Sequence, residues 1–171
     1  MKATGRRQSP ADKLPPEDRA REACLRALER RMRSRYELQV ILRRKRIPEE
    51  IGEQVLDRLT EVGLVNDEEF ARFFVTERQR SRPRGRRGLA AELRKRGIDS
   101  EVIDLVLDEV VEVEDPVEAA RRAVAGKLRA LAGKPGEERK RKAEAFLLRR
   151  GFNYDVIREA LGNLEAADEE P

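Results

Sequence analysis

One short pattern of apolar and basic residues occurs three times along this chain, at residues 42–47, 93–98 and 147–152. Each copy opens with a leucine, continues through two to four basic residues and closes with a large apolar residue, which is Ile47, Ile98 or Phe152. The copies start 51 and 54 residues apart, and further apolar residues follow each of them at matching offsets. A period near fifty residues indicates one supersecondary unit that is used repeatedly. Such repeats usually present long surfaces to a partner instead of one catalytic pocket.

The apolar spacing, the capping residues and the Gly and Pro breaks predict three helices in each unit. For example, Ser34 and Glu37 have the spacing of a capping box at the start of the second helix. The expected helices are 17–32, 35–45, 49–62, 67–80, 86–96, 100–112, 116–131, 137–150 and 154–164. No stretch alternates with period two, so we expect an all-α fold of three tandem three-helix-bundle repeats in an elongated arrangement. The predicted divisions are a flexible N-terminal tail (1–16), three repeats (17–65, 66–114 and 115–164) and an acidic C-terminal tail (165–171).

The composition is that of thin helical layers with wide solvated faces. Charged residues make up 42% of the chain, against about a quarter in typical proteins, and hydrophobic residues 39%. A single cysteine, Cys24, excludes an intramolecular disulfide, and its apolar helical setting predicts a buried reduced thiol. The N-terminal residues lack the apolar segment of a secretory signal, and no apolar run approaches the ~20 residues of a membrane span. We therefore expect a soluble cytoplasmic protein.

Several kinds of chemistry have no residues to support them. The chain has no histidine, which is the commonest general base and zinc ligand, and no glycine spacing typical of a phosphate-binding loop. Carboxylates cluster at residues 67–69 and at Asp104, Asp108 and Glu109, which a magnesium site would also need. Negative first turns and a solvated helix face account for them more simply. We expect no enzymatic activity, no catalytic residue, no metal or cofactor and no small-molecule substrate.

Basic residues are the candidate partner-binding groups. Residues 78–96 hold nine basic residues and one acid. Alternating arginines at a helix break repel each other unless an anion is near, so we interpret residues 78–87 as a binding segment for phosphate or an acidic protein surface. Basic residues that follow the repeated leucines either complement a helix dipole or bind a partner, and these two interpretations remain open. The candidate residues are Arg78, Arg80, Arg82, Arg84, Arg86, Arg87, Arg94, Lys95, Arg96, Arg43, Arg44, Lys45, Arg149 and Arg150.

Aromatic residues contribute little to such a surface. The five phenylalanines have apolar spacing and are expected in the core, whereas Tyr36 and Tyr154 lie near helix starts and are expected to be exposed. Two tyrosines do not form a stacking platform for bases.

Several fragments together resemble the RecX family. They include the spacing of Ser34, Glu37, Leu38 and Leu42, the run 66–71, the region around Gly85, the run 93–98 and the closing run 150–157. Their order and spacing cover about residues 19–164. The resemblance implies three tandem three-helix repeats and binding to the RecA recombinase, usually with inhibition. It also implies a position in the groove of the RecA filament on single-stranded DNA. Leu64 and Val65 depart from the family, which often has an aromatic residue there.

From the resemblance we expect a non-catalytic regulator of RecA that limits filament growth, ATP hydrolysis and strand exchange. The expected partners are the RecA filament and single-stranded DNA, with double-stranded DNA as a secondary expectation, and the chain is expected to act as a monomer. Two alternatives remain open. One is a sequence-independent DNA-binding or architectural protein without a RecA partner, and the other is a helical scaffold whose charges only keep it soluble.

Overall fold

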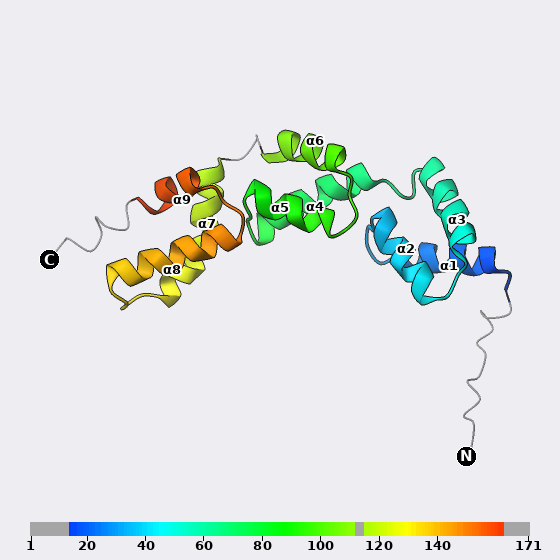
Figure 1. Ribbon diagram of the computed structural model, residues 1–171, viewed down its shortest axis with the longest axis horizontal. Coiled ribbons are helices and arrows are strands. Elements are labelled where there is room, and N and C mark those ends of the chain that lie inside the picture. Colours follow the sequence, from blue (N-terminus) through cyan, green and yellow to red (C-terminus); the bar gives the residue numbers. More distant parts are fainter. Residues whose placement is uncertain (1–13, 112–114, 163–171) are drawn as a thin grey trace, which may run out of the picture. The chain divides into compact units, whose positions relative to one another are not determined.

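The computed structural model describes residues 14–111 and 115–162, and every regular element in these ranges is a helix (Figure 1). Nine helices form there, and most of their bounds lie within two residues of the predicted ones. The all-α prediction is therefore confirmed, whereas both predicted tails, apart from residues 14–16, lie outside the described residues. In chain order the helices are α1 (Pro16–Leu28), α2 (Arg35–Arg44), α3 (Glu49–Glu61), α4 (Asp67–Ser81), α5 (Arg86–Arg94), α6 (Ser100–Val111), α7 (Pro116–Ala130), α8 (Gly136–Arg149) and α9 (Tyr154–Leu161).

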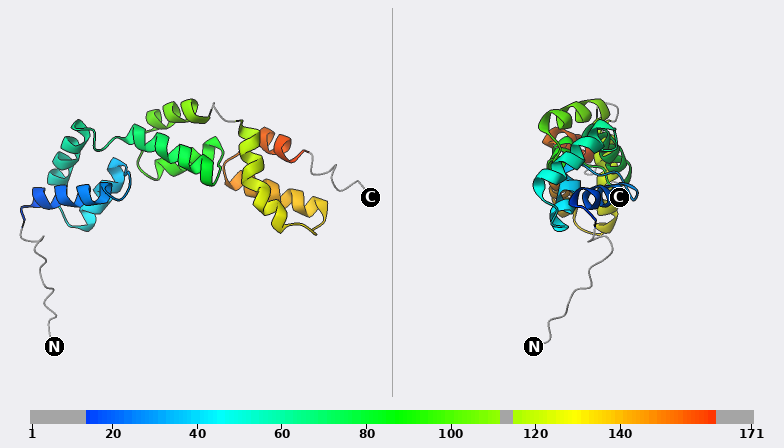
Figure 2. Two further views of the ribbon diagram at one scale, coloured as in Figure 1. Left: turned by 180° about the vertical axis from the view of Figure 1, so that it is seen from behind. Right: turned by 90° about the vertical axis from the view of Figure 1, so that its right-hand side faces the viewer.

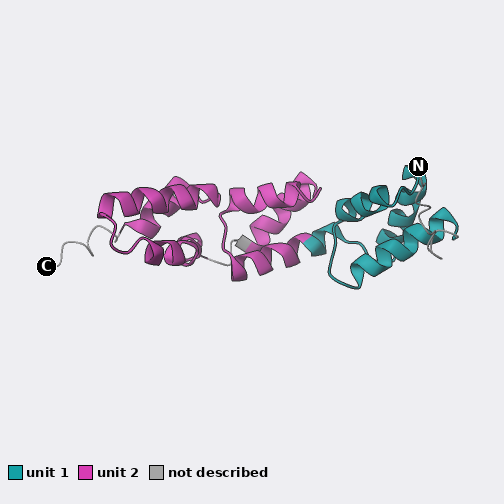
Figure 3. Cartoon of the chain, turned by 90° about the horizontal axis from the view of Figure 1, so that it is seen from below, with its two compact units in different colours: residues 1–70 teal, residues 71–171 magenta. Residues whose placement is uncertain are grey.

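The chain divides into two compact units, residues 1–70 and 71–171 (Figure 3). In the first unit α1, α2 and α3 each pack against the other two, and they form the blue-to-cyan bundle of Figure 2. Fully buried residues such as Cys24, Leu38 and Leu56 make its core. In the second unit α5 packs on α6, while α7, α8 and α9 pack around Ala120 and Leu147. Below, α1–α3, α4–α6 and α7–α9 are called the first, second and third repeats.

The threefold sequence pattern is the C-terminal end of the second helix of each repeat. In every copy the closing apolar residue donates its backbone N–H to the carbonyl oxygen of the opening leucine, at 3.1–3.2 Å. The residue before it donates to the carbonyl oxygen three residues back, at 2.9 Å in all three copies. These bonds form a Schellman motif, which needs a left-handed residue at its penultimate position. Gly97 and Gly151 fill that position with φ of 73° and 83°, whereas Arg46 fills it in the first repeat with φ of 57°.

The capping predictions are confirmed at most of the tested helix starts. Ser34 accepts a hydrogen bond from the Glu37 backbone N–H at 3.2 Å, and Asp115 accepts one from Val117 at 2.9 Å. The helix predicted at 17–32 nevertheless ends at Leu28. Buried Ser34 has the extended backbone of a cap, so the chain must leave the helix before it. Asn153 stands at the N-cap of α9 with an extended backbone, but its side chain makes no capping hydrogen bond.

Burial of the aromatic residues differs from the prediction in one clear case. Phe70 and Phe152 are buried, as predicted, but Phe73 is 53% exposed. The buried stripe of α4 passes through Val75 and Gln79, four residues apart, and Phe73 lies off that stripe. Burial of Cys24 is confirmed, and it raises the pKa of the thiol to about 11, so the sulfur stays protonated at neutral pH.

The start of α5 lies backbone against backbone on the turn that follows α8. The Gly85 N–H donates to the carbonyl oxygen of Arg150 at 3.1 Å. A Cβ atom on Gly85 would lie 2.2 Å from the carbonyl oxygen of Gly151, and one on Gly88 would lie 2.2 Å from that of Arg150. Real Cβ atoms do not approach backbone so closely, so glycine is required there. These glycines therefore hold the second and third repeats together within the second unit.

Candidate functional site

The arginine-dense segment at residues 78–87 forms the end of α4, a short connection and the start of α5. One carboxylate, Glu92 of α5, pairs with two of its arginines. Its oxygens lie 2.8 Å from Nη2 of Arg78 and 2.9 Å from Nε of Arg84. The Glu92 side chain is only 15% exposed, so salt screens these pairs less than surface pairs. Part of the negative charge that was predicted to come from a partner is therefore supplied by Glu92 of the protein itself.

A second acidic pair faces the start of α5. Nη1 of Arg86 lies 2.7 Å from Asp108, and its Nη2 lies 3.6 Å from Asp104. These are carboxylates that a magnesium site could have used. Their ion pairs with one guanidinium account for their position without a metal, in line with the interpretation as a solvated helix face.

Three other arginines of the segment are exposed. Arg80 pairs with Glu77 of the preceding turn at 3.0 Å. Arg82 and Arg87 have no ion pair within the parts of the chain that the structure describes. The segment is therefore not one uniform binding surface. Some of its arginines form ion pairs with carboxylates of the protein itself, whereas Arg82 and Arg87 form none within the described residues.

Arg150, at the turn after α8, completes the junction. Its Nη1 donates to the carbonyl oxygen of Pro83 at 3.2 Å, and its guanidinium lies 4.5 Å from the centre of the Phe146 ring. Burial and then the positive charges of Arg84, Arg82 and Arg78 lower the pKa of Arg150. The junction thus keeps a net positive potential, although Arg150 itself has a structural role.

The turn after α5 carries three further candidates. The Arg96 guanidinium lies 4.2 Å from the centre of the Phe74 ring and donates to the carbonyl oxygen of Glu92 at 2.9 Å. Arg94 and Lys95 are exposed and have no ion pair among the described residues. Arg149, at the equivalent end of α8, is exposed in the same way.

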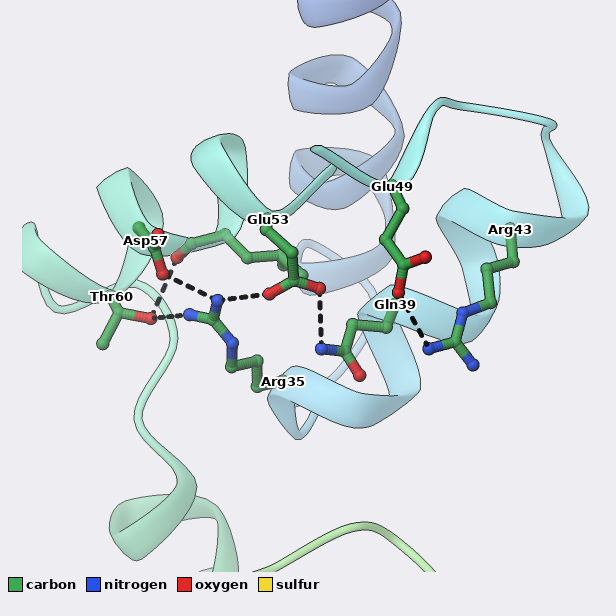
Figure 4. A network of polar contacts seen from close by, with 8 residues as sticks. Arg35, Gln39, Arg43, Glu49, Glu53, Asp57 and Thr60 are labelled. Carbon is green, nitrogen blue, oxygen red and sulfur yellow. Dashed lines mark hydrogen bonds and ion pairs between the residues drawn. The ribbon is translucent and has the colours of Figure 1, made fainter. Parts of the chain in front are cut away.

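The first repeat gathers seven basic side chains around one groove. Arg43 lies 4.0 Å from Glu49, but Arg44 and Lys45 are exposed and have no ion-pair partner in the described ranges (Figure 4 shows the Arg43–Glu49 pair). Together with Arg46 they form one wall of a groove of about 690 Å³ between α1 and α2, which we call the first-repeat groove. The other wall carries four arginines, Arg19, Arg26, Arg30 and Arg33.

Arg46 and the four arginines of the other wall are not among the residues predicted from the sequence. A signal for the wall was nevertheless present. Residues 19 and 26 are seven positions apart, which places them on one face of α1, whereas Arg30 and Arg33 follow the end of that helix at Leu28. The pairing of this face with the end of α2 could not be read from the spacing, because it depends on how the two helices pack.

On the α2–α3 face of the same repeat, carboxylates surround a single guanidinium. The Arg35 guanidinium lies 2.6 Å from Glu53 and 2.7 Å from Asp57, and Gln39 donates to Glu53 at 2.8 Å (Figure 4). The Arg35 backbone N–H donates to Asp67 at 2.7 Å. This network holds α2 on α3, and it contrasts with the first-repeat groove, where cations outnumber carboxylates.

Two kinds of feature are absent from residues 14–111 and 115–162. Within these ranges no three His, Cys, Asp or Glu side chains gather as metal ligands. None of the helices there has both the length and the apolar character to cross a bilayer.

Comparison with known proteins places these features in one family. Residues 20–59, 66–107 and 114–161 match the first, second and third three-helix domains of RecX, respectively. The regulatory protein RecX of Thermobifida fusca (strain YX) is 42% identical over 166 residues, which cover 93% of this chain and 89% of the relative. That of Mycolicibacterium smegmatis is 42% identical over 86% of this chain and 82% of the relative. The crystal structure of RecX from Lactobacillus salivarius has the same fold, with a TM-score of 0.73, 22% identity and coverage of 88% of this chain and 97% of that one.

Proposed function

Because the chain belongs to the RecX family, whose named relatives are regulatory proteins, we propose that it is a non-catalytic inhibitor of the RecA recombinase. The proposed target is the RecA filament on single-stranded DNA. The chain binds in the groove of that filament and limits its growth, its ATP hydrolysis and strand exchange. Contacts are made both to acidic protein surface and to the DNA backbone.

One observation supports the binding step of this proposal. Each repeat ends its second helix with exposed cations that no described carboxylate neutralises, namely Arg44 and Lys45, Arg94 and Lys95, and Arg149. A basic last turn favours the helix dipole, but that interaction is worth only about 0.3–1 kcal/mol at the surface. The same unpaired cations in three repeats also suit a partner whose own negative charges recur, as those of a nucleoprotein filament do.

The test is the rate of DNA-dependent ATP hydrolysis by RecA as this protein is added. Suppression is expected well below one molecule per recombinase subunit, because blocking filament growth affects many subunits. An unchanged rate up to an equimolar ratio would contradict the proposal. Binding to bare DNA with no effect on RecA would instead favour a sequence-independent DNA-binding protein.

A charge-matched pair of variants locates the contact. Replacing Lys45, Lys95 and Arg149 by alanine removes one unpaired cation from each repeat, and should weaken inhibition. The control replaces three arginines that pair with acids on their own helices, Arg21, Arg121 and Arg158. Both variants lose three positive charges, so equal loss of inhibition would mean that net charge, and not these helix ends, recruits the filament.

A further inference from the structure

Arg46 holds a backbone conformation that glycine adopts at the aligned positions of the other two repeats. Its φ is 57°, and among the described residues it is the one non-glycine with positive φ. A side chain with a Cβ atom is disfavoured in this conformation, and such strain persists where the surrounding structure and function maintain it. A glycine would close the same Schellman motif with less strain, as Gly97 and Gly151 do. The arginine side chain at this position therefore needs an explanation other than folding.

That side chain lines the first-repeat groove, where positive charge is poorly compensated. The groove is bordered by seven basic side chains and by one carboxylate among its described lining residues, Glu22, which is already paired with Arg26. Arg30, Arg44 and Arg46 have no ion-pair partner within the described ranges. Like charges gathered in this way repel one another, and a bound polyanion relieves the repulsion.

Arg33 also lines the groove, and its guanidinium is incompletely hydrogen-bonded. Its side chain is 22% exposed and lies 3.6 Å from Glu37, yet its Nε is buried without a hydrogen-bond partner. A buried donor that lacks an acceptor is destabilising. Because Arg33 lines the groove, its charge adds to those that a bound polyanion neutralises.

The remaining lining selects among anions. The floor is formed by small or aliphatic side chains such as Ala23, Ala27 and Ile41, and no aromatic ring is among the described residues that line the groove. Bases would therefore find no stacking surface, so recognition must be of charge. Six of the seven cations are arginines, whose planar forks bind phosphate oxygens in pairs. Arg19 and Arg26 are separated by about 10 Å along α1, at 1.5 Å per residue, which is more than one small anion can bridge.

We propose that the first-repeat groove binds the phosphodiester backbone of single-stranded nucleic acid, and that Arg46 is kept in its strained conformation because its guanidinium contacts a phosphate. The inference deepens the proposed function, since it names the ligand of the first repeat. The test of this inference needs no recombinase, so the inference and the proposed function can be refuted independently. A groove that binds DNA in a protein without effect on RecA would sink the proposed function alone.

The experiment compares Arg46→Gly with Arg21→Ala in the full chain. Arg21 is exposed, pairs with Glu17 and Asp18, and does not line the groove. Arg46→Gly should raise the melting temperature by about 2–4 °C, because it removes the strain. It should also weaken binding of an oligothymidylate by about tenfold and make the salt slope shallower by about 0.7, the effect of one lost phosphate contact. Arg21→Ala should change neither the affinity nor the slope by comparable amounts.

Fluorescence anisotropy with three probes tests the assignment of the ligand. An abasic oligomer of the same length should bind to within a few-fold of oligothymidylate and show the same loss in Arg46→Gly. Polyglutamate, the third probe, represents an acidic protein surface. If Arg46→Gly binds DNA as tightly as Arg21→Ala does, the groove does not bind a nucleic-acid backbone. The same conclusion follows if Arg46→Gly weakens only the binding of polyglutamate. More than tenfold weaker binding of the abasic oligomer would overturn the backbone assignment. A melting temperature that falls in Arg46→Gly would refute the strain argument.

Discussion

Replacing Gly88 by alanine tests whether the close backbone approach joins the second and third repeats. The added Cβ would lie 2.2 Å from the carbonyl oxygen of Arg150, whereas an ordinary C···O contact is at least about 3.3 Å. The start of α5 must therefore move by about 1 Å from the turn after α8. That movement breaks or weakens the hydrogen bond from the Gly85 N–H to Arg150, which contributes about 1 kcal/mol to stability. The steric crowding destabilises the protein further, by about 1–3 kcal/mol. Alanine has a higher helix propensity than glycine, which stabilises the protein by about 1 kcal/mol. The expected net decrease in the free energy of unfolding is therefore about 1–3 kcal/mol.

Gly126→Ala is the matched control for this substitution. Gly126 also lies within a helix of the second unit, α7, and a Cβ there would meet nothing within 4 Å. The same chemical change should therefore stabilise the protein, by up to about 1 kcal/mol. Urea denaturation of both variants gives the comparison, and hydrogen exchange at the Gly85 amide reports the junction directly. If Gly88→Ala is as stable as Gly126→Ala and the Gly85 amide stays protected, the backbone contact does not hold the repeats together.

Three other outcomes are expected. Burial raises the pKa of Asp67 more than the N–H bond and the charge of Arg35 lower it, so ionising Asp67 opposes folding. Asp67→Asn should be more stable than the parent at pH 7, and this gain should fade as the pH falls towards about 4, the pKa of an unfolded Asp, in urea titrations. Arg84→Ala should lower the free energy of unfolding by about 1 kcal/mol, because it leaves Glu92 with one ion-pair partner fewer. Arg82→Ala should change the free energy of unfolding by no more than about 0.5 kcal/mol. Equal stability of the two variants would show that Glu92 does not anchor the segment. Purified protein incubated with magnesium and either labelled DNA or ATP should release no product, and activity that co-purifies with the chain would refute its non-catalytic character.

Local sequence signals were enough to predict the helices, because their determinants lie within a few residues of each other. The capping pair Ser34–Glu37 is read from spacing alone, and the structure places it as expected. The glycine breaks used to end the predicted helices include Gly97 and Gly151, whose backbones are left-handed in the structure. Order and spacing of the fragments also indicated the family, which the matches to its three domains confirm. The exposed cations after the repeated leucines were likewise named in advance, although their role in binding stays a prediction.

The sequence alone therefore determined the repeat, the helix content and the family, since each depends on short-range order that a periodic pattern records. The tertiary structure decided which charges remain available. Glu92 neutralises Arg78 and Arg84 only because α4 and α5 pack together, and the arginines of α1 reach those after α2 only across an interhelical groove. The strain at Arg46 could not be predicted from the sequence either. An arginine aligned with two glycines does not reveal whether its backbone adopts the left-handed conformation of those glycines. Ion pairing and burial depend on distances between helices, and those distances arise only when the helices pack.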